Sequence, residues 1–203
     1  MKKFLAAAAS ICAMSVVAHA ADIAPALDQK DWFVKVGGTY VIPDSAGTLP
    51  RLGRPVTVGN AFTGSVEAGR FLSDRFSVSL TVGIPPTHDV LVSGVKVGTV
   101  TLGAAALDAQ FHLINNGPFD LYLGGGVAYN MYVSNTVPFV TGVDSGFAPV
   151  LQVGAEYKFA NNIGVFADVK KEFFTTTVHH AILGNYQERL DPLAITVGLA
   201  LHF

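Results

Sequence analysis

The chain has 203 residues, of which half are apolar and only 14% are charged, whereas about 25% of the residues of a typical soluble domain are charged. This length allows one domain but not two domains with separate cores. Two of the 13 basic residues lie in an N-terminal segment that we expect to be removed, and the 11 that remain against 15 acidic residues leave a net charge of −4. That balance argues against nucleic acid as a partner.

Residues 1–20 have the features of a secretory signal peptide. Two lysines precede an apolar run over 4–17, and the segment ends in Ala-His-Ala, an A-x-A cleavage site. The run is shorter than the ~20 residues that a transmembrane helix needs. We therefore expect a signal peptide over 1–20 and one mature domain over 21–203. Cys12 is the only cysteine and would leave with the signal, so we expect neither a disulfide nor a cysteine metal ligand.

The mature sequence favours strands over membrane helices. Its longest uncharged stretch, 121–143, contains three consecutive glycines and a proline, which disfavour a spanning helix. In contrast, residues 76–84 alternate without error between apolar residues and Ser, Thr or Gly. Residues 193–203 alternate in the same way over the ~9–11 residues of a tilted membrane strand. Only a β-strand separates these residues onto two faces.

Six further segments alternate less perfectly, so the sequence predicts eight strands, and bacterial outer-membrane barrels have an even number. The predicted strands cover residues 32–41, 60–71, 76–84, 99–113, 119–133, 147–159, 163–173 and 193–203. Their connections alternate between short ones at 72–75, 114–118 and 160–162 and long ones at 42–59, 85–98, 134–146 and 174–189. Short periplasmic turns and long outer loops are typical of outer-membrane barrels.

The soluble alternative is a lipocalin-like barrel, which shares the alternation but needs a charged exterior. The segments 76–84 and 193–203 carry no Lys, Arg, Asp or Glu. Trp32 and Tyr40 share a face eight residues apart, about 27 Å along a strand and about 20 Å of depth after tilting, close to the apolar band of a membrane barrel. The prediction is an all-β fold, an eight-stranded antiparallel up-and-down transmembrane β-barrel in the outer membrane of a Gram-negative bacterium.

The order and spacing of several segments resemble the OmpW family of small outer-membrane barrels. The similar segments are Trp-Phe-Val-Lys-Val-Gly at 32–37, 74–85 with His88 after it, Ala-Gln-Phe-His-Leu at 109–113, 119–132, Arg-Leu-Asp-Pro at 189–192 and the terminal Phe203. The resemblance implies passive uptake of small apolar molecules, which would enter from outside and leave sideways into the bilayer. It also implies an apolar constriction, yet the matching positions, Thr81 and Lys170, are not apolar here.

The lumen of eight strands has room only for side chains or one small ligand, so a wide aqueous pore is not expected. On the predicted register ten polar side chains face it. They are Lys35, Glu67, Thr81, Asp108, Gln110, Tyr122, Gln152, Glu156, Asp168 and Lys170. Because buried charges must be paired, we expect a salt-bridged plug in the periplasmic half, with Lys35 beside Glu67. Apolar ligand space would then lie near the outer mouth, lined by residues such as Leu49, Val90, Leu91 and Val140.

A sideways exit needs a break in the strand ladder, and proline cannot donate a ladder hydrogen bond. Pro85, Pro86 and Pro149 are candidate rims of such an opening; alternatively, they only mark strand ends. At the C-terminus, Val197, Leu199, Leu201 and Phe203 fit the alternating pattern with a final aromatic residue that the barrel assembly machinery is thought to read. Phe203 fits a membrane-interface aromatic equally well.

The remaining candidates point to neither catalysis nor a bound cofactor. His88 with Asp89, the pair His179-His180, Ser93 and Ser145 fall in predicted long loops without the spacing of a triad. Adjacent histidines lack a convergent third metal ligand. We expect no enzyme activity, no metal and no cofactor. The competing function is a closed structural barrel whose loops bind lipopolysaccharide, host surfaces or phage; in both functions the partners include outer-membrane lipid, and in uptake also small apolar solutes.

Overall fold

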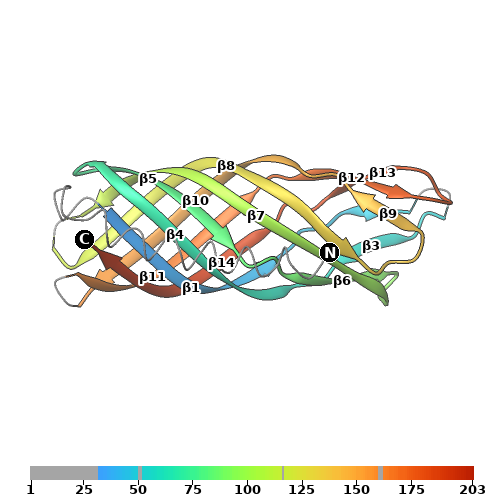
Figure 1. Cartoon of the computed structure of the whole chain (residues 1–203), viewed down its shortest axis with the longest axis horizontal. Coiled ribbons are helices and arrows are strands. Elements are labelled where there is room, and N and C mark those ends of the chain that lie inside the picture. The colour runs from blue at the N-terminus through green and yellow to red at the C-terminus, as the bar shows by residue number, and fades with distance from the viewer. Residues whose placement is uncertain (1–31, 50–51, 116, 160–161) are drawn as a thin grey trace, which may run out of the picture.

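Eight long strands form one closed antiparallel barrel (Figure 1). The computed structural model describes residues 32–49, 52–115, 117–159 and 162–203, and the predicted signal peptide with Cys12 lies outside these ranges. In ring order the barrel strands are β1 (Trp32–Ile42), β4 (Ala61–Ser73), β5 (Phe76–Gly83), β7 (Val95–Ile114), β8 (Phe119–Asn135), β10 (Gly146–Lys158), β11 (Ile163–Glu172) and β14 (Leu193–His202). Pairing of β14 with β1 closes the ring. The prediction of an eight-stranded antiparallel barrel is confirmed.

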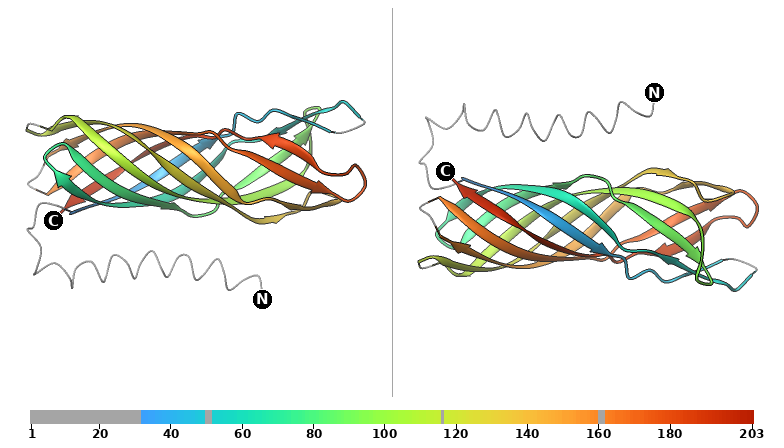
Figure 2. Two further views of the ribbon diagram at one scale, coloured as in Figure 1. Left: turned by 90° about the horizontal axis from the view of Figure 1, so that it is seen from above. Right: turned by 90° about the horizontal axis from the view of Figure 1, so that it is seen from below.

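The sequence predicts long outer loops, but the long outer connections are not simple loops. Their described residues contain six short strands, β2 (Gly47–Thr48), β3 (Pro55–Val58), β6 (Thr87–Val92), β9 (Val140–Val143), β12 (Thr175–His180) and β13 (Tyr186–Arg189). β2, β3 and β6 extend the barrel sheet from β7, whereas β13, β12 and β9 form a separate sheet, here called the outer sheet. Figure 2 shows these strands prolonging the tube beyond the end of β1 and β14. The alternation of apolar and polar residues in these strands spans only two to six residues and is interrupted by Gly and Pro. It was therefore too weak to predict them as strands.

The outward face of the barrel is apolar, as contact with lipid requires. Aromatic side chains concentrate toward its two ends. Phe76 packs against Phe111 near the periplasmic turns, and Tyr129 packs against Phe147 on the outer side, each pair at 4.9 Å between ring centroids. The exposed residues between them include Val36, Leu80, Val82, Leu107, Leu123, Val127, Leu151, Val153, Val165, Val197 and Leu199. Among the described residues, no helix is long and apolar enough to cross a membrane.

The strand register brings the inward polar residues together. Lys35 of β1 lies opposite Glu67 of β4, which in turn lies opposite Thr81 of β5. On the other side of the barrel, Gln152 of β10 lies opposite Lys170 of β11. Because alternate residues point inward, these positions converge on the barrel axis.

Candidate functional site

A cluster of ionised and polar side chains, here called the polar plug, fills the periplasmic half of the barrel. Its members come from all eight barrel strands. They are Lys35, Glu67, Ser77, Ser79, Thr81, Asp108, Gln110, His112, Asp120, Tyr122, Gln152, Glu156, Asp168, Lys170 and His202. All ten residues that alternation placed in the lumen are therefore among them, and their functional roles remain predictions.

Lys170 is the cation of the plug layer nearest the extracellular end, here called the upper layer. Its Nζ atom lies 2.5 Å from Asp108 Oδ2 and 3.1 Å from Glu67 Oε2, and it donates a hydrogen bond of 2.9 Å to Thr81 Oγ1. These groups come from β11, β7, β4 and β5. One ammonium thus holds four strands together across the lumen. Lys170 and Thr81 are also the two positions at which the family resemblance implied an apolar constriction. In this structure both positions are polar.

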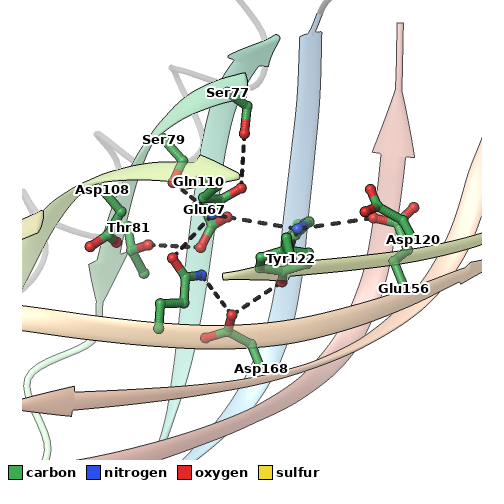
Figure 3. A network of polar contacts seen from close by, with 12 residues as sticks. Glu67, Ser77, Ser79, Thr81, Asp108, Gln110, Asp120, Tyr122, Glu156 and Asp168 are labelled. Carbon is green, nitrogen blue, oxygen red and sulfur yellow. Dashed lines mark hydrogen bonds and ion pairs between the residues drawn. The ribbon is translucent and has the colours of Figure 1, made fainter. Parts of the chain in front are cut away.

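Lys35 is the cation of the middle layer. Its Nζ atom lies 3.8 Å from Glu67 Oε1 and 4.0 Å from Glu156 Oε2, and it donates to Tyr122 Oη at 3.1 Å. The Tyr122 hydroxyl in turn donates to Asp168 Oδ2 at 3.1 Å (Figure 3). Each carboxylate therefore has a cation or a hydrogen-bond donor beside it, which is the condition under which buried charge is tolerated.

Amide groups connect the two layers. Gln110 Nε2 donates to Glu67 Oε1 at 2.9 Å and to Ser79 Oγ at 3.1 Å (Figure 3). Gln152 Nε2 donates to Asp168 Oδ2 at 2.6 Å. Both amides are almost completely buried. The network is therefore continuous around the barrel axis.

Two histidines complete the plug at the periplasmic end, and the sequence reasoning did not single them out. His112 Nδ1 lies 2.8 Å from Asp120 Oδ1, and His202 Nε2 lies 2.6 Å from Glu156 Oε1. The Nε2 atom of His112 also hydrogen-bonds to Ser77 Oγ at 2.9 Å. The alternation had put both histidines on inward faces, so the signal was present, but it did not show which carboxylate each would meet.

The plug leaves no room for a water channel. The cavity among Lys35, Glu67, Asp168 and Lys170 has a volume of about 10 Å³, which is about the space that a single water molecule needs. The charged members Lys35, Glu67, Asp108, Glu156 and Asp168 are at most 6% exposed. An aqueous pore through this half of the barrel is therefore closed in this structure.

Directly above the plug lies an apolar chamber, here called the inner cavity, with a volume of about 130 Å³. Its floor is polar: Thr81 and Lys170 belong to the plug, and Asn130 donates to Glu172 Oε2 at 2.9 Å beside them. Its walls are mostly apolar and include Val41, Val58, Ile84, Leu102, Phe174 and Leu190. A chamber of this size and lining resembles apolar cavities that hold a benzene-sized molecule.

A second chamber, the outer cavity, continues toward the extracellular end and has a volume of about 60 Å³. Val58, Leu102 and Leu190 border both cavities, so the two chambers are adjacent. Its further lining includes Val56, Val90, Val100, Val137, Val140, Val143 and Val178.

Two of the four residues expected around apolar ligand space, Val90 and Val140, line the outer cavity. Leu49 packs against the neighbouring cluster of Val56, Val90 and Val100. The expectation for Leu91 was wrong, because Leu91 follows the buried Val90 on β6 and does not line this cavity.

The barrel wall beside the inner cavity has a break in its hydrogen-bond ladder. β5 pairs with β7 as far as Val82, and pairing on β7 resumes only where Thr87 begins β6. On the other side, the last contacts to β4 are the backbone bond from Ile84 N to Gly64 O at 2.9 Å and a side-chain bond from Thr63 to the Ile84 carbonyl.

Pro85 and Pro86 lie within this break. Neither has an N–H to donate to a neighbouring strand. The Pro86 carbonyl accepts a bond of 3.2 Å from Leu102 N, and Pro86 lines the inner cavity, as do Gly83 and Ile84. The interrupted ladder thus faces the apolar chamber directly.

Pro149 lies in a different environment. It is inside β10, opposite Val127 of β8, and its carbonyl accepts a bond of 3.1 Å from Phe173 N. Its ring is exposed on the outer surface and does not line the inner cavity. Pro149 therefore does not line the chamber, and because it lies inside a paired strand it does not mark a strand end either.

The residues considered for catalysis or metal binding lie apart from one another. His88 is buried on β6, where its Nδ1 atom bonds to Gly59 O at 2.8 Å, so its assignment to a loop was wrong. His179 and His180 are likewise on β12, and His179 Nε2 bonds to Asp144 Oδ1 at 2.7 Å. The described part of the chain contains no group of three His, Cys, Asp or Glu side chains that could hold a metal ion.

Ser93 and Ser145 belong to local turns. Ser93 has a positive φ of 50° in the turn between β6 and β7, and Ser145 Oγ accepts a hydrogen bond of 3.1 Å from Tyr132 N. Neither hydroxyl is hydrogen-bonded to a histidine in the structure described.

Comparison with known proteins identifies the family. The model of the OmpW family matches residues 28–203, so the chain belongs to the OmpW family. Similar curated proteins are the uncharacterised outer-membrane protein y4mB of Sinorhizobium fredii, 27% identical over 98% of this chain and 90% of that protein, and the dibenzothiophene metabolism operon protein DoxH of a Pseudomonas strain, 26% identical over 87% of this chain and 90% of that protein. The expected family and the outer-membrane location are confirmed.

The fold is also that of known outer-membrane barrels. The crystal structure of OprG from Pseudomonas aeruginosa matches 86% of this chain and 96% of its own with a TM-score of 0.76, at 18% sequence identity. This likeness establishes the shared barrel architecture. Because the chain belongs to the OmpW family and resembles a named outer-membrane protein over nearly its whole length, the apolar outward face described above is in contact with the outer-membrane bilayer.

Proposed function

From an OmpW-family barrel with this interior, we propose passive uptake of small apolar molecules across the outer membrane. A solute enters the outer cavity from the extracellular end and passes to the inner cavity. It then leaves through the wall beside Pro85 and Pro86 into the bilayer. The observation that carries the proposal is the position of an apolar chamber directly above a closed polar plug and beside an interrupted strand ladder.

The plug supports sideways exit over passage into the periplasm. An apolar solute that continued downward would have to displace the ion pairs of Lys170 and Lys35. Separating buried ions from their partners costs ~3–5 kcal/mol for each pair broken. Moving apolar surface into lipid hydrocarbon, in contrast, is favourable by about 25 cal/mol per Å² removed from water. The bilayer is therefore the lower-energy destination.

The ladder break supports a specific exit. Elsewhere in the wall a solute would have to separate two strands joined by continuous hydrogen bonds, such as β8 and β10. Beside Pro85 and Pro86 only a few bonds link the segment 84–86 to β4 and β7. We propose these two prolines as the rim of the exit.

The names of relatives agree with an apolar substrate class. DoxH and PahQ are named as proteins of a dibenzothiophene metabolism operon, and dibenzothiophene is an apolar aromatic molecule. We propose that the present chain serves a solute of the same class, small enough for the inner cavity.

We further propose that the outward residues Val197, Leu199 and Leu201, together with Phe203, form the signal for barrel assembly. The first three are exposed on β14, and Phe203 exchanges backbone hydrogen bonds of 2.9 and 3.0 Å with Trp32. In the assembled barrel this edge is already paired with β1, so the signal would be read before the ring closes. The outer sheet would contact lipopolysaccharide, which surrounds the extracellular end in the membrane.

The test is the entry of a small apolar fluorescent solute into cells with intact lipopolysaccharide, with and without the protein. Gly83→Leu would place a side chain into the inner cavity next to the break in the strand ladder. Gly83 is on the inward face of β5 and lines this cavity, and a Cβ atom at position 83 would meet only Gly64 O, at 3.7 Å. The matched control is Gly125→Leu, where a Cβ meets only Val150 O at 3.6 Å and Leu151 at 4.0 Å. Gly125 shares the outward face of Leu123 and Val127.

We expect the wild type and the Gly125→Leu variant to accelerate entry of the apolar solute and Gly83→Leu to slow it several-fold. Entry of a sugar of similar size should not change in any strain. Equal entry of the apolar solute with and without the protein would refute uptake and favour the closed structural barrel, whose outer sheet would bind lipopolysaccharide, host surfaces or phage.

A further inference from the structure

Among the described residues, one buried carboxyl group in the outer part of the barrel has no hydrogen-bond partner. Glu188 lies on β13, at the end of the tube opposite the C-terminus (Figure 1). It is only 3% exposed, and neither of its carboxyl oxygens makes a hydrogen bond. The plug carboxylates, in contrast, have lysines, histidines or amides beside them. A buried polar group without a partner is unfavourable and calls for an explanation.

The surroundings of Glu188 are apolar. The side chain lines the outer cavity, whose other members are mostly valines and leucines. Leu190 follows two residues later on the same face and borders both cavities. On its other side the carboxyl group packs against Gly47 of β2. A Cβ atom at position 47 would collide with the Glu188 carboxyl oxygens. Glu188 is therefore held at the wall of the solute path and not in solvent.

The neighbouring charges do not reach Glu188. Arg189 is exposed and forms its ion pairs with Asp191, at 3.4 Å, and with Asp44, at 3.9 Å. Tyr186 also lines the outer cavity, but its hydroxyl makes no bond to the carboxyl. Burial among apolar side chains raises the pKa of Glu188 to about 7, so near neutral pH much of the group is an uncharged carboxylic acid.

We propose that Glu188 is the hydrogen-bonding anchor of a binding site in the outer cavity for apolar molecules that carry one hydroxyl group, such as phenols and apolar alcohols. This proposal rests on the proposed function and specifies its substrate class. The hydroxyl meets the carboxyl after a rotation about the Glu188 side-chain torsions. Because the outer cavity of about 60 Å³ is smaller than the benzene-sized inner cavity, the apolar body passes between Leu102 and Leu190, which border both cavities, and extends into the inner cavity of about 130 Å³.

The chemistry of the pair explains why a neutral hydroxyl fits better than an ammonium ion. A protonated carboxyl both donates and accepts a hydrogen bond, and a hydroxyl does the same, so the two satisfy each other. A cation would have to lose its hydration in a cavity without any other charged lining residue. It would also be unable to continue into lipid hydrocarbon, whereas a phenol or alcohol can.

The experiment compares p-cresol with p-xylene, in which a methyl group replaces the hydroxyl. The full-length mature barrel in lipid nanodiscs, with methyl-labelled valines, is titrated with each compound at known free concentration. Shifts of the methyl signals of Val140 and Val178, which line the outer cavity, report binding at this site. The variants are Glu188→Leu, which removes the anchor, and Glu188→Gln, which keeps a donor and an acceptor. The barrel spectrum itself shows that each variant is folded.

We expect the wild type to prefer p-cresol about tenfold, as a hydrogen bond of about 1.4 kcal/mol would give. Glu188→Leu should lose this preference while still binding p-xylene, and Glu188→Gln should keep part of it. An equal preference in the wild type and Glu188→Leu would refute the anchor. If p-xylene binds but p-cresol is not preferred, the anchor fails and the uptake proposal stands. If neither compound shifts the valine signals, both proposals fail.

Discussion

Replacement of Lys170 by methionine tests whether the polar plug holds the barrel together. The substitution keeps an unbranched side chain of similar length but removes the ammonium that contacts Asp108, Glu67 and Thr81. Within the described interior, six buried carboxyl side chains of the plug and cavity floor would then face a single lysine, Lys35. The six are Glu67, Asp108, Asp120, Glu156, Asp168 and Glu172.

The expected loss of stability follows from the carboxylates that Lys170→Met leaves without a cation. Asp108 is 1% exposed, and Lys170 is the cation within contact distance of its carboxylate. Removing one member of a buried ion pair typically costs ~3–5 kcal/mol, because the other charge stays buried without compensation. Glu67 would be affected less, since Lys35 remains 3.8 Å away. We therefore expect Lys170→Met to lower the free energy of unfolding by about 3–5 kcal/mol.

The assay is urea unfolding of the barrel in lipid vesicles, followed by the fluorescence of Trp32, the only tryptophan of the chain. The matched control is Lys96→Met, because Lys96 also pairs with a carboxylate, Asp89 at 2.7 Å, but both side chains are more than half exposed. Exposed pairs contribute only ~0–1 kcal/mol.

A double variant separates loss of charge pairing from loss of packing. Lys170→Met combined with Asp108→Leu should recover much of the stability, because no carboxylate at position 108 is then left unpaired. The reasoning about the plug is refuted if Lys170→Met destabilises the barrel no more than Lys96→Met does.

Three further predictions concern Glu188, Gly154 and Phe203. The pKa of Glu188 is raised from 4.5 to about 7, so the outer sheet should be most stable below pH 4.5 and lose about 3 kcal/mol as the pH rises from 4.5 to just above 7; the free energy of local opening from hydrogen exchange should show this fall in the wild type and not in Glu188→Gln. A Cβ at Gly154 would lie 2.3 Å from the buried Tyr122 ring, so Gly154→Ala should cost about 1–3 kcal/mol in urea unfolding, whereas Gly125→Ala should change little. Deletion of Phe203 should lower the amount of barrel recovered from outer membranes; an unchanged amount would contradict its role in assembly.

The alternation of side chains determined which residues face the lumen and which face lipid. Strand geometry admits only two faces, so Lys35, Glu67 and Asp108 could be assigned to the interior from the sequence alone. The scarcity of charge on the opposite face of 76–84 and 193–203 distinguished a membrane barrel from a soluble one. The even number of predicted strands agreed with the same conclusion.

The partners of these residues depended on register and on distances across the barrel. Lys170 lies 62 positions after Asp108 along the chain, and no local pattern predicts that their side chains meet. The outer strands escaped prediction because short strands such as Thr87–Val92 become recognisable only when neighbouring strands satisfy their hydrogen bonds.

The difference between the prolines was likewise decided by tertiary structure. Pro86 and Pro149 look alike in the sequence, but Pro86 faces an apolar chamber at a ladder break, whereas Pro149 lies inside a paired strand. The isolation of Glu188 has the same origin, because only the folded barrel places the other described polar side chains beyond hydrogen-bonding distance of its carboxyl group. The sequence alone therefore determined the architecture through local periodicity, and only the closure of the ring decided which charges pair, where apolar space remains and where the hydrogen-bond ladder of the wall is interrupted.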